Sequence, residues 1–288
     1  MRKLSYPGRS NVLAQNGMVA TSNPLSSMVA INVLQKGGNA VDAAIAASAV
    51  QAVVCPSATG IGGDCFAIIS MNGKKPIAVN GSGIAPKKAN LQFYKDNKIK
   101  NIGLTSPHSV TIPGAVHAWC SMHEKFGRID FNEVLNGAEN FARKGFPVHE
   151  VEAIAWKENE KKLKKNSNSK RLFLNKNLSY GFGEVFKNIP LANTLRNISK
   201  NKIKGFYQSE ITEDMVKTLN KLGGLHTEED FYNQKTLFSK TITNSYRNLK
   251  IHQCPLNSPG LVVLMMMAMI EKLNIKKYHP SSLSLIHI

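Results

Sequence analysis

The order of elements in residues 39–70 constrains the fold of this chain most strongly. The segment NAVDAAIAASAVQAVV (39–54) is alanine-rich and apolar over most of its surface, which predicts a buried helix. The glycine turn CPSATGIGGDCF (55–66) follows, and FAIIS (66–70) predicts a strand. Loops that bind phosphate run in the opposite order, from strand to glycine turn to helix, because the helix N-terminus faces the anion. Cys65 also stands where a third glycine would belong, so we expect no phosphate loop.

Another helix is predicted just upstream, over residues 22–39. Ser22 or Asn23 can cap it, Pro24 suits its first turn, and Gly37-Gly38 ends it. Its large apolar residues recur at helical spacing. They predict a core-facing stripe made of Leu25, Met28, Ile31 and Leu34.

Short strands are predicted at several places. Residues 76–86 predict a second strand after FAIIS, and Asn72-Gly73 between the two is a signal for a type I′ hairpin turn. Residues 241–255 predict two strands around a turn at positions 246–248. Residues 109–127 predict a strand, a Pro-Gly break and a helix closed by Gly127.

Further helices are predicted over residues 131–146, 190–201, 210–222 and 260–273. The last contains GLVVLMMMAMI (260–270), which is too short to span a bilayer and predicts a buried helix packed with methionines. Taken together, the elements predict an α/β chain of the α+β kind, with helices stacked on mostly antiparallel strands.

The formal net charge of +18 over 288 residues raises the question of a nucleic-acid partner. The densest basic segment, KENEKKLKKNSNSK (157–170), includes Glu158 and Glu160 and contains neither aromatic residues nor arginine. We therefore expect a solvated, mobile excursion here and no specific nucleic-acid partner. The N-terminus has no apolar signal segment, which predicts a cytoplasmic protein without membrane association.

The cysteines and histidines show no spacing typical of a metal site. Cysteines occur at positions 55, 65, 120 and 254, and buried, reduced thiols are the expected outcome. His117 and His123 are six residues apart, which places them on different faces of a helix, and His123-Glu124 does not extend to H-E-x-x-H. We expect no metal ion and no cofactor.

Many motifs, in the same order along the chain, resemble the γ-glutamyltransferase family. The longest runs from GMVATS through GIGGDCF (17–66), and the others are VTIPGAVHAW, FARKGFPV, LANTLRNI, GFYQSEI, GGLHTEEDF and YRNLKIHQCPLNSPG. The family consists of N-terminal-nucleophile hydrolases with an αββα sandwich, so the resemblance implies that fold, incomplete in this chain. It covers residues 17–275, after a lead-in of residues 1–16. Residues 276–288 match no family pattern and are interpreted as a non-native tail.

The resemblance also implies a chemistry. A precursor of this family cleaves itself before a threonine, whose hydroxyl becomes the nucleophile and whose new α-amino group becomes the general base. That stretch does not occur in residues 1–288, so we expect the catalytic threonine to lie beyond residue 288, on a small subunit from the same precursor. The resemblance thus implies a large-subunit fragment that is inactive alone.

The site residues implied by the resemblance lie in two segments. Gly60, Gly62, Gly63 and Asp64 form a loop that reaches the active-site cleft; a tight structural turn is the alternative. Typical members carry Arg-Glu-x-Ala-Pro, and that arginine holds the α-carboxylate of the glutamyl group. Ser82 and Gly83 occupy the Arg-Glu positions here, which resembles a divergent branch that includes cephalosporin-acylase-like and oxamate-amidohydrolase-like enzymes. Lys87 or Lys88 could substitute for the missing cation.

The function expected is therefore transfer or hydrolysis of γ-glutamyl compounds such as glutathione. The alternatives are an amidase acting on a small acid amide or an acyl side chain, and a non-catalytic pseudoenzyme chain. A small-molecule substrate and the small subunit are the expected partners.

Overall fold

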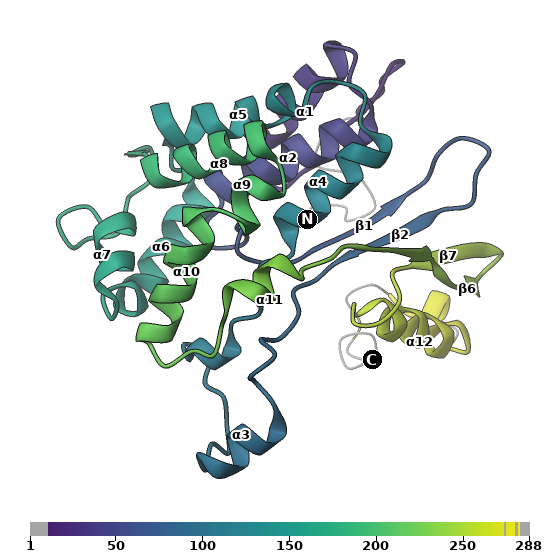
Figure 1. Cartoon of the computed structure of the whole chain (residues 1–288). Helices are drawn as coiled ribbons and strands as arrows, with labels where there is room; N and C mark the ends of the chain where they lie inside the picture. Colours follow the sequence, from purple (N-terminus) through teal and green to yellow (C-terminus); the bar gives the residue numbers. More distant parts are fainter. Residues whose placement is uncertain (1–10, 274, 280–281, 283–288) are drawn as a thin grey trace. The chain divides into compact units, whose positions relative to one another are not determined.

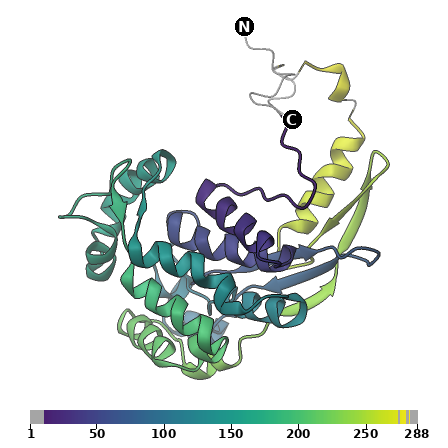
Figure 2. The same cartoon turned by 90° about the horizontal axis from the view of Figure 1, so that it is seen from above.

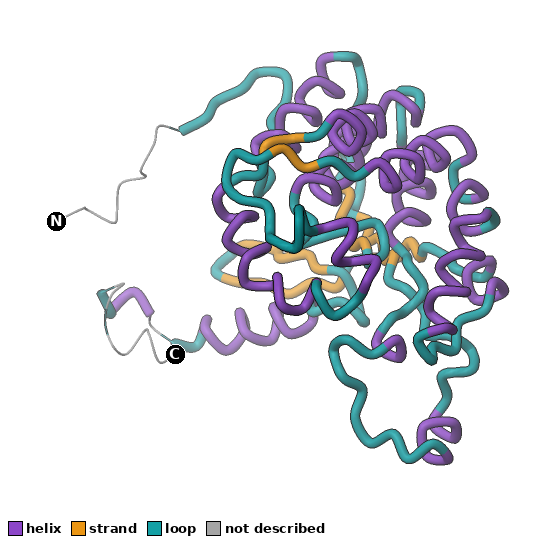
Figure 3. The backbone as a smooth tube through the Cα atoms, turned by 90° about the vertical axis from the view of Figure 1, so that its left-hand side faces the viewer, coloured by secondary structure: helices purple, strands orange, loops and turns teal. Residues whose placement is uncertain are grey.

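The computed structural model describes residues 11–273, 275–279 and 282. The chain forms two compact units. The first draws on residues up to 60 and on 126–200, and the second on residues 61–125 and from 201 onward. Helices predominate and the strands are short, as the purple and orange segments of Figure 3 show.

The first unit is mainly helical. Its strands β3 (Phe146–Pro147) and β4 (Val185–Phe186) pair antiparallel. Helices α1, α2 and α5 pack side by side (Figure 1). The helices of this unit are α1 (Pro24–Gln35), α2 (Ala40–Val54), α5 (Phe131–Lys144), α6 (Glu150–Leu163), α7 (Ser167–Phe173) and α8 (Ile189–Asn201).

Helix α1 begins and ends where the sequence predicts. The Asn23 side chain accepts a hydrogen bond from the Leu25 N–H at 2.9 Å, and Pro24 is the first helical residue. The chain leaves the helix through Gly37, whose φ of +92° lies in the left-handed region that glycine tolerates.

The predicted apolar stripe of α1 is wrong. The buried residues are Ser26, Val29, Ala30 and Val33, whereas Met28 is 48% exposed. Small side chains allow the neighbouring backbones to approach closely. A Cβ added to Gly137 of α5 would lie 2.6 Å from a Val29 methyl group. Close packing of small residues therefore decides which face is buried, and the larger apolar residues lie to the side.

Helix α2 is buried along most of its length, as predicted. It starts with a capping box, in which Asn39 caps the helix and the Asp42 carboxylate accepts from the Asn39 N–H at 2.9 Å. Asp42 is fully buried and also accepts from the Arg128 N–H at 3.0 Å. These bonds fix the start of the helix whose C-terminal end carries Cys55.

The basic segment 157–170 is helical at both ends, and its lysines are exposed, as predicted for a solvated segment. It forms the end of α6 and the start of α7. Glu160 is 9% exposed; its carboxylate pairs with Lys164 at 2.7 Å and with Lys157 at 3.2 Å. It also accepts from the Ser179 N–H and hydroxyl, both at 3.0 Å. Glu160, an acidic residue within the basic segment, therefore links this segment to Ser179 and to two of its own lysines.

The second unit contains two antiparallel sheets. One has the strand order β1-β2-β5, and the other is the hairpin of β6 and β7. The strands are β1 (Cys65–Ile69), β2 (Ile77–Gly81), β5 (Leu237–Lys240), β6 (Ile242–Tyr246) and β7 (Leu249–Gln253). The predicted arrangement of helices on mostly antiparallel strands is confirmed.

The two hairpins of this unit use different turns. Between β1 and β2, the Lys74 N–H bonds to the Met71 carbonyl, and only Gly73 has a positive φ, of +72°. A type I′ turn needs positive φ at both central residues, so the type I′ prediction at Asn72-Gly73 is wrong although the hairpin itself is confirmed. Between β6 and β7, Arg247 and Asn248 have φ of +46° and +67°, which fits a two-residue type I′ loop.

The helices of the second unit include short and long ones. α3 lies at the tip of a long excursion between β2 and α4 (Figures 1 and 3). The predicted strand at the start of 109–127 is not formed, because a 3-10 turn, Pro107–Ser109, precedes an irregular segment that leads into α4. The α-helices are α3 (Leu91–Asp96), α4 (Ala115–Phe126), α9 (Lys204–Tyr207), α10 (Glu210–Lys221), α11 (Glu228–Tyr232) and α12 (Gly260–Glu271), and a 3-10 helix spans Ile275–Lys277.

Helix α12 is not buried, contrary to prediction. It runs beside the β6–β7 hairpin, as Figures 1 and 2 show, but only Gly260 and Leu264 are buried. Its outer face is apolar and is formed by Val262, Met265, Met266 and Met269, each at least half exposed. A contiguous exposed apolar face of this kind is typical of an interaction surface. Across the described residues, none of the helices has the length and hydropathy needed to cross a membrane.

Candidate functional site

The glycine loop contacts the start of α4 through its backbone. The Gly63 carbonyl accepts from the Gly114 and Ala115 N–H groups, both at 2.9 Å. Gly62, Gly63 and Asp64 are exposed. Gly60 is also exposed and belongs to the first unit. The backbone of the loop is therefore held to the start of α4 at Gly63.

The structure does not require glycine at every position of the loop. A Cβ added to Gly60 or Gly62 would meet no described atom within 4 Å, and neither residue has a positive φ. The close approach occurs next to the loop instead, where a Cβ on Gly114 would lie 2.2 Å from the Gly81 carbonyl oxygen. The predicted reason for glycine, close approach of one backbone to another, thus applies to Gly81 and Gly114. It does not apply to Gly60 or Gly62.

Ser82 and Gly83 leave the end of β2 and contact this loop. The Gly83 N–H donates to the Asp64 carboxylate at 2.8 Å. A Cβ on Gly83 would lie 1.8 Å from the Ile112 carbonyl oxygen, so only glycine fits there. Within the second unit, the structure therefore brings Gly63, Asp64, Ser82 and Gly83 into one constellation, in which Asp64 joins the two predicted segments.

The Ser82 side chain lies among neutral amide groups. Its hydroxyl is 2.9 Å from Asn257 Nδ2 and 3.2 Å from Asn257 Oδ1. Asn257 Oδ1 also accepts from Asn80 Nδ2 at 2.9 Å, and Asn80 Oδ1 accepts from the Ser82 N–H at 2.9 Å. Gln234 Nε2 donates to the Ser82 carbonyl at 3.1 Å. Neutral donors and acceptors, rather than a cation, surround the position that the resemblance assigns to arginine.

Sequence reasoning missed Asn80, Gln234 and Asn257. Asn257 lies in the LNSPG stretch that carries part of the resemblance, so that motif was a usable signal for it. Gln234 is about 150 residues from Ser82 in the sequence and has no motif that points to Ser82. Only the pairing of β2 with β5 brings its segment close.

The thiol beside this constellation is not a nucleophile at neutral pH. Burial raises the pKa of Cys65 to about 11, and the nearby Cys254 and Asp64 add to the rise. All four cysteines are free, as predicted; Cys55, Cys120 and Cys254 are buried, whereas Cys65, which was also expected to be buried, is only half-buried. The constellation therefore offers hydrogen-bond donors and acceptors rather than a reactive thiol.

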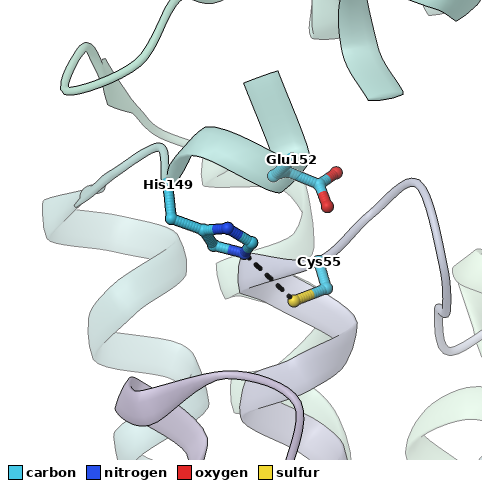
Figure 4. A group of neighbouring side chains, drawn as sticks. All are labelled: Cys55, His149 and Glu152. Atoms are coloured by element: carbon cyan, nitrogen blue, oxygen red, sulfur yellow. Dashed lines mark hydrogen bonds between the residues drawn. The ribbon is translucent and has the colours of Figure 1, made fainter. Parts of the chain in front are cut away.

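A second cluster lies in the first unit and joins Cys55, His149 and Glu152 (Figure 4). Cys55 Sγ is 3.7 Å from His149 Nε2, and one ligand atom from each of the three residues lies within 4.8 Å of the others. The cluster is invisible to spacing motifs, because 94 residues separate Cys55 from His149. The pair His149 and Glu152, three residues apart, is the only local signal in the sequence.

Solved structures define the class of protein to which this fold belongs. The chain superposes on the γ-glutamyltranspeptidase of Helicobacter pylori with a TM-score of 0.89 and 30% identity, covering 96% of this chain and 81% of that chain. It superposes on a cephalosporin acylase from Bacillus halodurans with a TM-score of 0.89 and 31% identity, covering 99% of this chain and 54% of that chain. The mixed α/β fold is that of the N-terminal-nucleophile hydrolases, as expected.

The sequence comparisons give the family. The family model described as gamma-glutamyltranspeptidase matches residues 26–288, so the match extends over residues 276–288, for which no family pattern was expected and most of which lie outside the described residues. The Glutathione hydrolase-like YwrD proenzyme of Bacillus subtilis (strain 168) is 30% identical over 280 residues, covering 96% of this chain and 53% of the relative. The Glutathione hydrolase proenzyme of Escherichia coli (strain K12) is 30% identical over 272 residues, covering 93% and 47%. The chain belongs to the γ-glutamyltranspeptidase family, and it spans about half the length of the curated relatives it matches.

Proposed function

We propose that this chain supplies the substrate-binding part of a self-processing amidohydrolase of the γ-glutamyltranspeptidase family. The reaction is transfer or hydrolysis of an acyl group held in an amide, through an acyl-enzyme on a threonine of a second segment. The threonine hydroxyl attacks the amide carbonyl while its α-amino group takes the hydroxyl proton. The α-amino group then passes this proton to the amide nitrogen, and the amine leaves as the C–N bond breaks. Water or an acceptor amine then takes the acyl group.

The surroundings of Ser82 carry the proposal about substrate. An arginine holds a carboxylate through two charge-assisted hydrogen bonds in a planar fork. The Ser82 hydroxyl and the amides of Asn80 and Asn257 offer neutral hydrogen bonds instead. These neutral groups suit an uncharged or small polar acyl group better than the α-carboxylate of a glutamyl group. This favours the second candidate, an amidase for small acid amides or acyl side chains, over an efficient glutathione hydrolase.

We further propose that activity requires a second segment of the same precursor. The apolar outer face of α12, with Met265 56% exposed, supports this proposal because such a face is covered in a complete protein. The relatives are proenzymes of about twice the matched length, which agrees with it. On this proposal residues 1–288 are inactive by themselves, because the nucleophile and its oxyanion donors would lie on the second segment.

The test uses two proteins: residues 1–288, and the longer product of the same gene. The longer product is expected to divide into two polypeptides, the smaller beginning with threonine, and to turn over a γ-glutamyl anilide or a small amide. N-terminal sequencing and p-nitroaniline release measure the two properties. Turnover by residues 1–288 above a heat-killed control would contradict the proposal, and so would an intact, inactive longer product, which would indicate a pseudoenzyme.

A further inference from the structure

The cluster of Cys55, His149 and Glu152 comes together from two ends of helices. Cys55 is the residue at which α2 ends, and His149 is the residue before α6. Glu152 lies in the first turn of α6. All three belong to the first unit, so one compact body holds the cluster. Figure 4 shows the imidazole and the carboxylate on the α6 side, with the thiol facing the imidazole.

The buried carboxylate of Glu152 has neutral partners in the described part of the chain. It is 3% exposed and accepts from the Ser57 N–H at 2.9 Å and the Ser57 hydroxyl at 2.8 Å. An acidic residue at this helix position often bonds back to the N–H at the start of its own helix. Glu152 turns to Ser57 instead, beside Cys55. A buried charge with only neutral partners is costly, so a cation at this place would be favourable.

The imidazole of His149 is available as a ligand. His149 stands at the cap position of α6 and makes no side-chain capping bond. Its ring is half-buried, and Nε2 faces the sulfur at 3.7 Å. Ser57 orients Glu152, and the Asn23 amide donates to Cys55 Sγ at 3.5 Å. Outer contacts of this kind hold metal ligands in place.

We propose that Cys55, His149 and Glu152 form a binding site for a divalent transition-metal ion, with Zn²⁺ as the preferred ion. Zinc binds thiolate sulfur at about 2.3 Å and imidazole nitrogen at about 2.0–2.1 Å, which places these atoms about 3.6 Å apart in a tetrahedron. The observed 3.7 Å matches this separation. Side-chain adjustment of Glu152 closes the remaining separations, all of which are below 4.8 Å.

The mixed ligand set selects the ion. One sulfur, one imidazole nitrogen and one carboxylate oxygen suit zinc better than the all-oxygen preference of calcium or magnesium. Three protein ligands leave the fourth position to water, and a cavity of about 170 Å³ lined by Ser57, Glu152 and Trp156, among others, reaches the carboxylate.

The charges balance when the ion binds. The Cys55 thiol loses its proton to solvent, and its sulfur donates an electron pair to the metal. Thiolate and carboxylate then neutralise the two positive charges of the ion, while the imidazole stays neutral.

The experiment titrates the chelator-treated full chain with Zn²⁺ in a calorimeter, and with Co²⁺ while recording absorbance. We expect one ion per chain, release of about one proton and a thiolate-to-cobalt charge-transfer band. His149→Ala should weaken Zn²⁺ binding about 100-fold or more, because substitutions of outer-shell partners alone cost 10–100-fold. Cys55→Ala should abolish the cobalt band.

Matched controls use His252→Ala and Cys254→Ala, which alter the same residue types in the other unit. They should leave the affinity and the band unchanged. His149→Ala removes no capping bond, and its circular dichroism should match that of the unaltered chain. Absence of stoichiometric binding, or binding that survives both His149→Ala and Cys55→Ala, would overturn the proposal.

Discussion

The surroundings of Ser82 and of Glu152 differ in the kind of polar group they hold. Ser82 lies half-buried among neutral amides, and its hydrogen bonds leave no charge that needs a partner. Glu152 places a carboxylate in a buried setting next to a thiol and an imidazole. The polar groups around Ser82 satisfy one another through hydrogen bonds. The buried carboxylate of Glu152, in contrast, would be stabilised by a bound cation. The difference teaches that the segment named by the family motif and the strongest cluster of ionisable ligands are separate features of this chain.

The largest loss of stability is expected from a substitution at Gly83, next to Ser82, where the backbone leaves no room for a side chain. Gly83→Ala places a methyl group 1.8 Å from the Ile112 carbonyl oxygen, and backbone must move to admit it. We expect the free energy of unfolding to fall by about 3 kcal/mol or more, the upper end for overpacking. Gly62→Ala is the matched control, because its Cβ would meet no described atom, and it should change stability by no more than about 0.5 kcal/mol. Chemical denaturation measures both, and equal losses would contradict the packing argument.

The next largest effect is the stabilisation of the chain by Zn²⁺, which should depend on His149 but not on Ser82. Zn²⁺ at 100 times its Kd should stabilise the native chain by about 2.7 kcal/mol. Thermal unfolding with and without a chelator should therefore differ for the unaltered chain and for Ser82→Ala. It should not differ for His149→Ala. A chelator effect that persists in His149→Ala would mean that zinc acts elsewhere.

A smaller effect is expected from Glu160, a charged residue whose partners are in place. The Lys164 ammonium, the Ser179 N–H and hydroxyl, and Lys157 hold the pKa of the Glu160 carboxyl well below its ordinary value of 4.5. A depressed folded-state pKa stabilises the chain above the unfolded-state pKa, and this stability is lost as the pH falls. Glu160→Gln should therefore lower the unfolding temperature at neutral pH, and the deficit should shrink below about pH 4.5.

The exposed Glu158→Gln serves as the control and should show little change at either pH. If the unfolding temperature of Glu160→Gln fell further below that of the unaltered chain as the pH was lowered, the result would contradict this prediction. In contrast to Glu152, Glu160 already has lysine partners, so added Zn²⁺ should leave its effect unchanged.

Sequence reasoning succeeded where local chemistry decides the structure. Asn23 caps α1 because its side chain can satisfy a free N–H group, and Gly37 ends this helix because it adopts a positive φ. These signals lie within a few residues of their effect. The family motifs also pointed to Ser82, Gly83 and Asp64 as site residues, which stays a prediction; the structure joins Gly83 to Asp64 through one hydrogen bond.

The sequence failed where distant segments decide the outcome. The buried face of α1 follows from contact at Val29 with Gly137, and hydropathy along α1 does not contain that information. The apolar run of α12 predicts burial, yet its outer face is exposed in this chain. Cys55 and His149 meet only because the end of α2 lies beside the start of α6. Spacing rules for metal motifs do not cover such an arrangement.

The central claim is that this protein uses glutathione poorly because it has serine in place of the carboxylate-binding arginine. Substitution of residue 82 tests this claim most directly. The longer gene product should be assayed for kcat/KM on glutathione and on oxamate, as wild type and as Ser82→Arg, with Ser82→Lys as the control. Two charge-assisted hydrogen bonds of about 1.5–3 kcal/mol each correspond to about 100-fold or more in binding. We predict weak glutathione turnover by the wild type, a rise of about tenfold or more in Ser82→Arg, and a smaller rise in Ser82→Lys, which brings charge without the planar fork. Efficient glutathione turnover by the wild type that Ser82→Arg leaves unchanged would contradict the account.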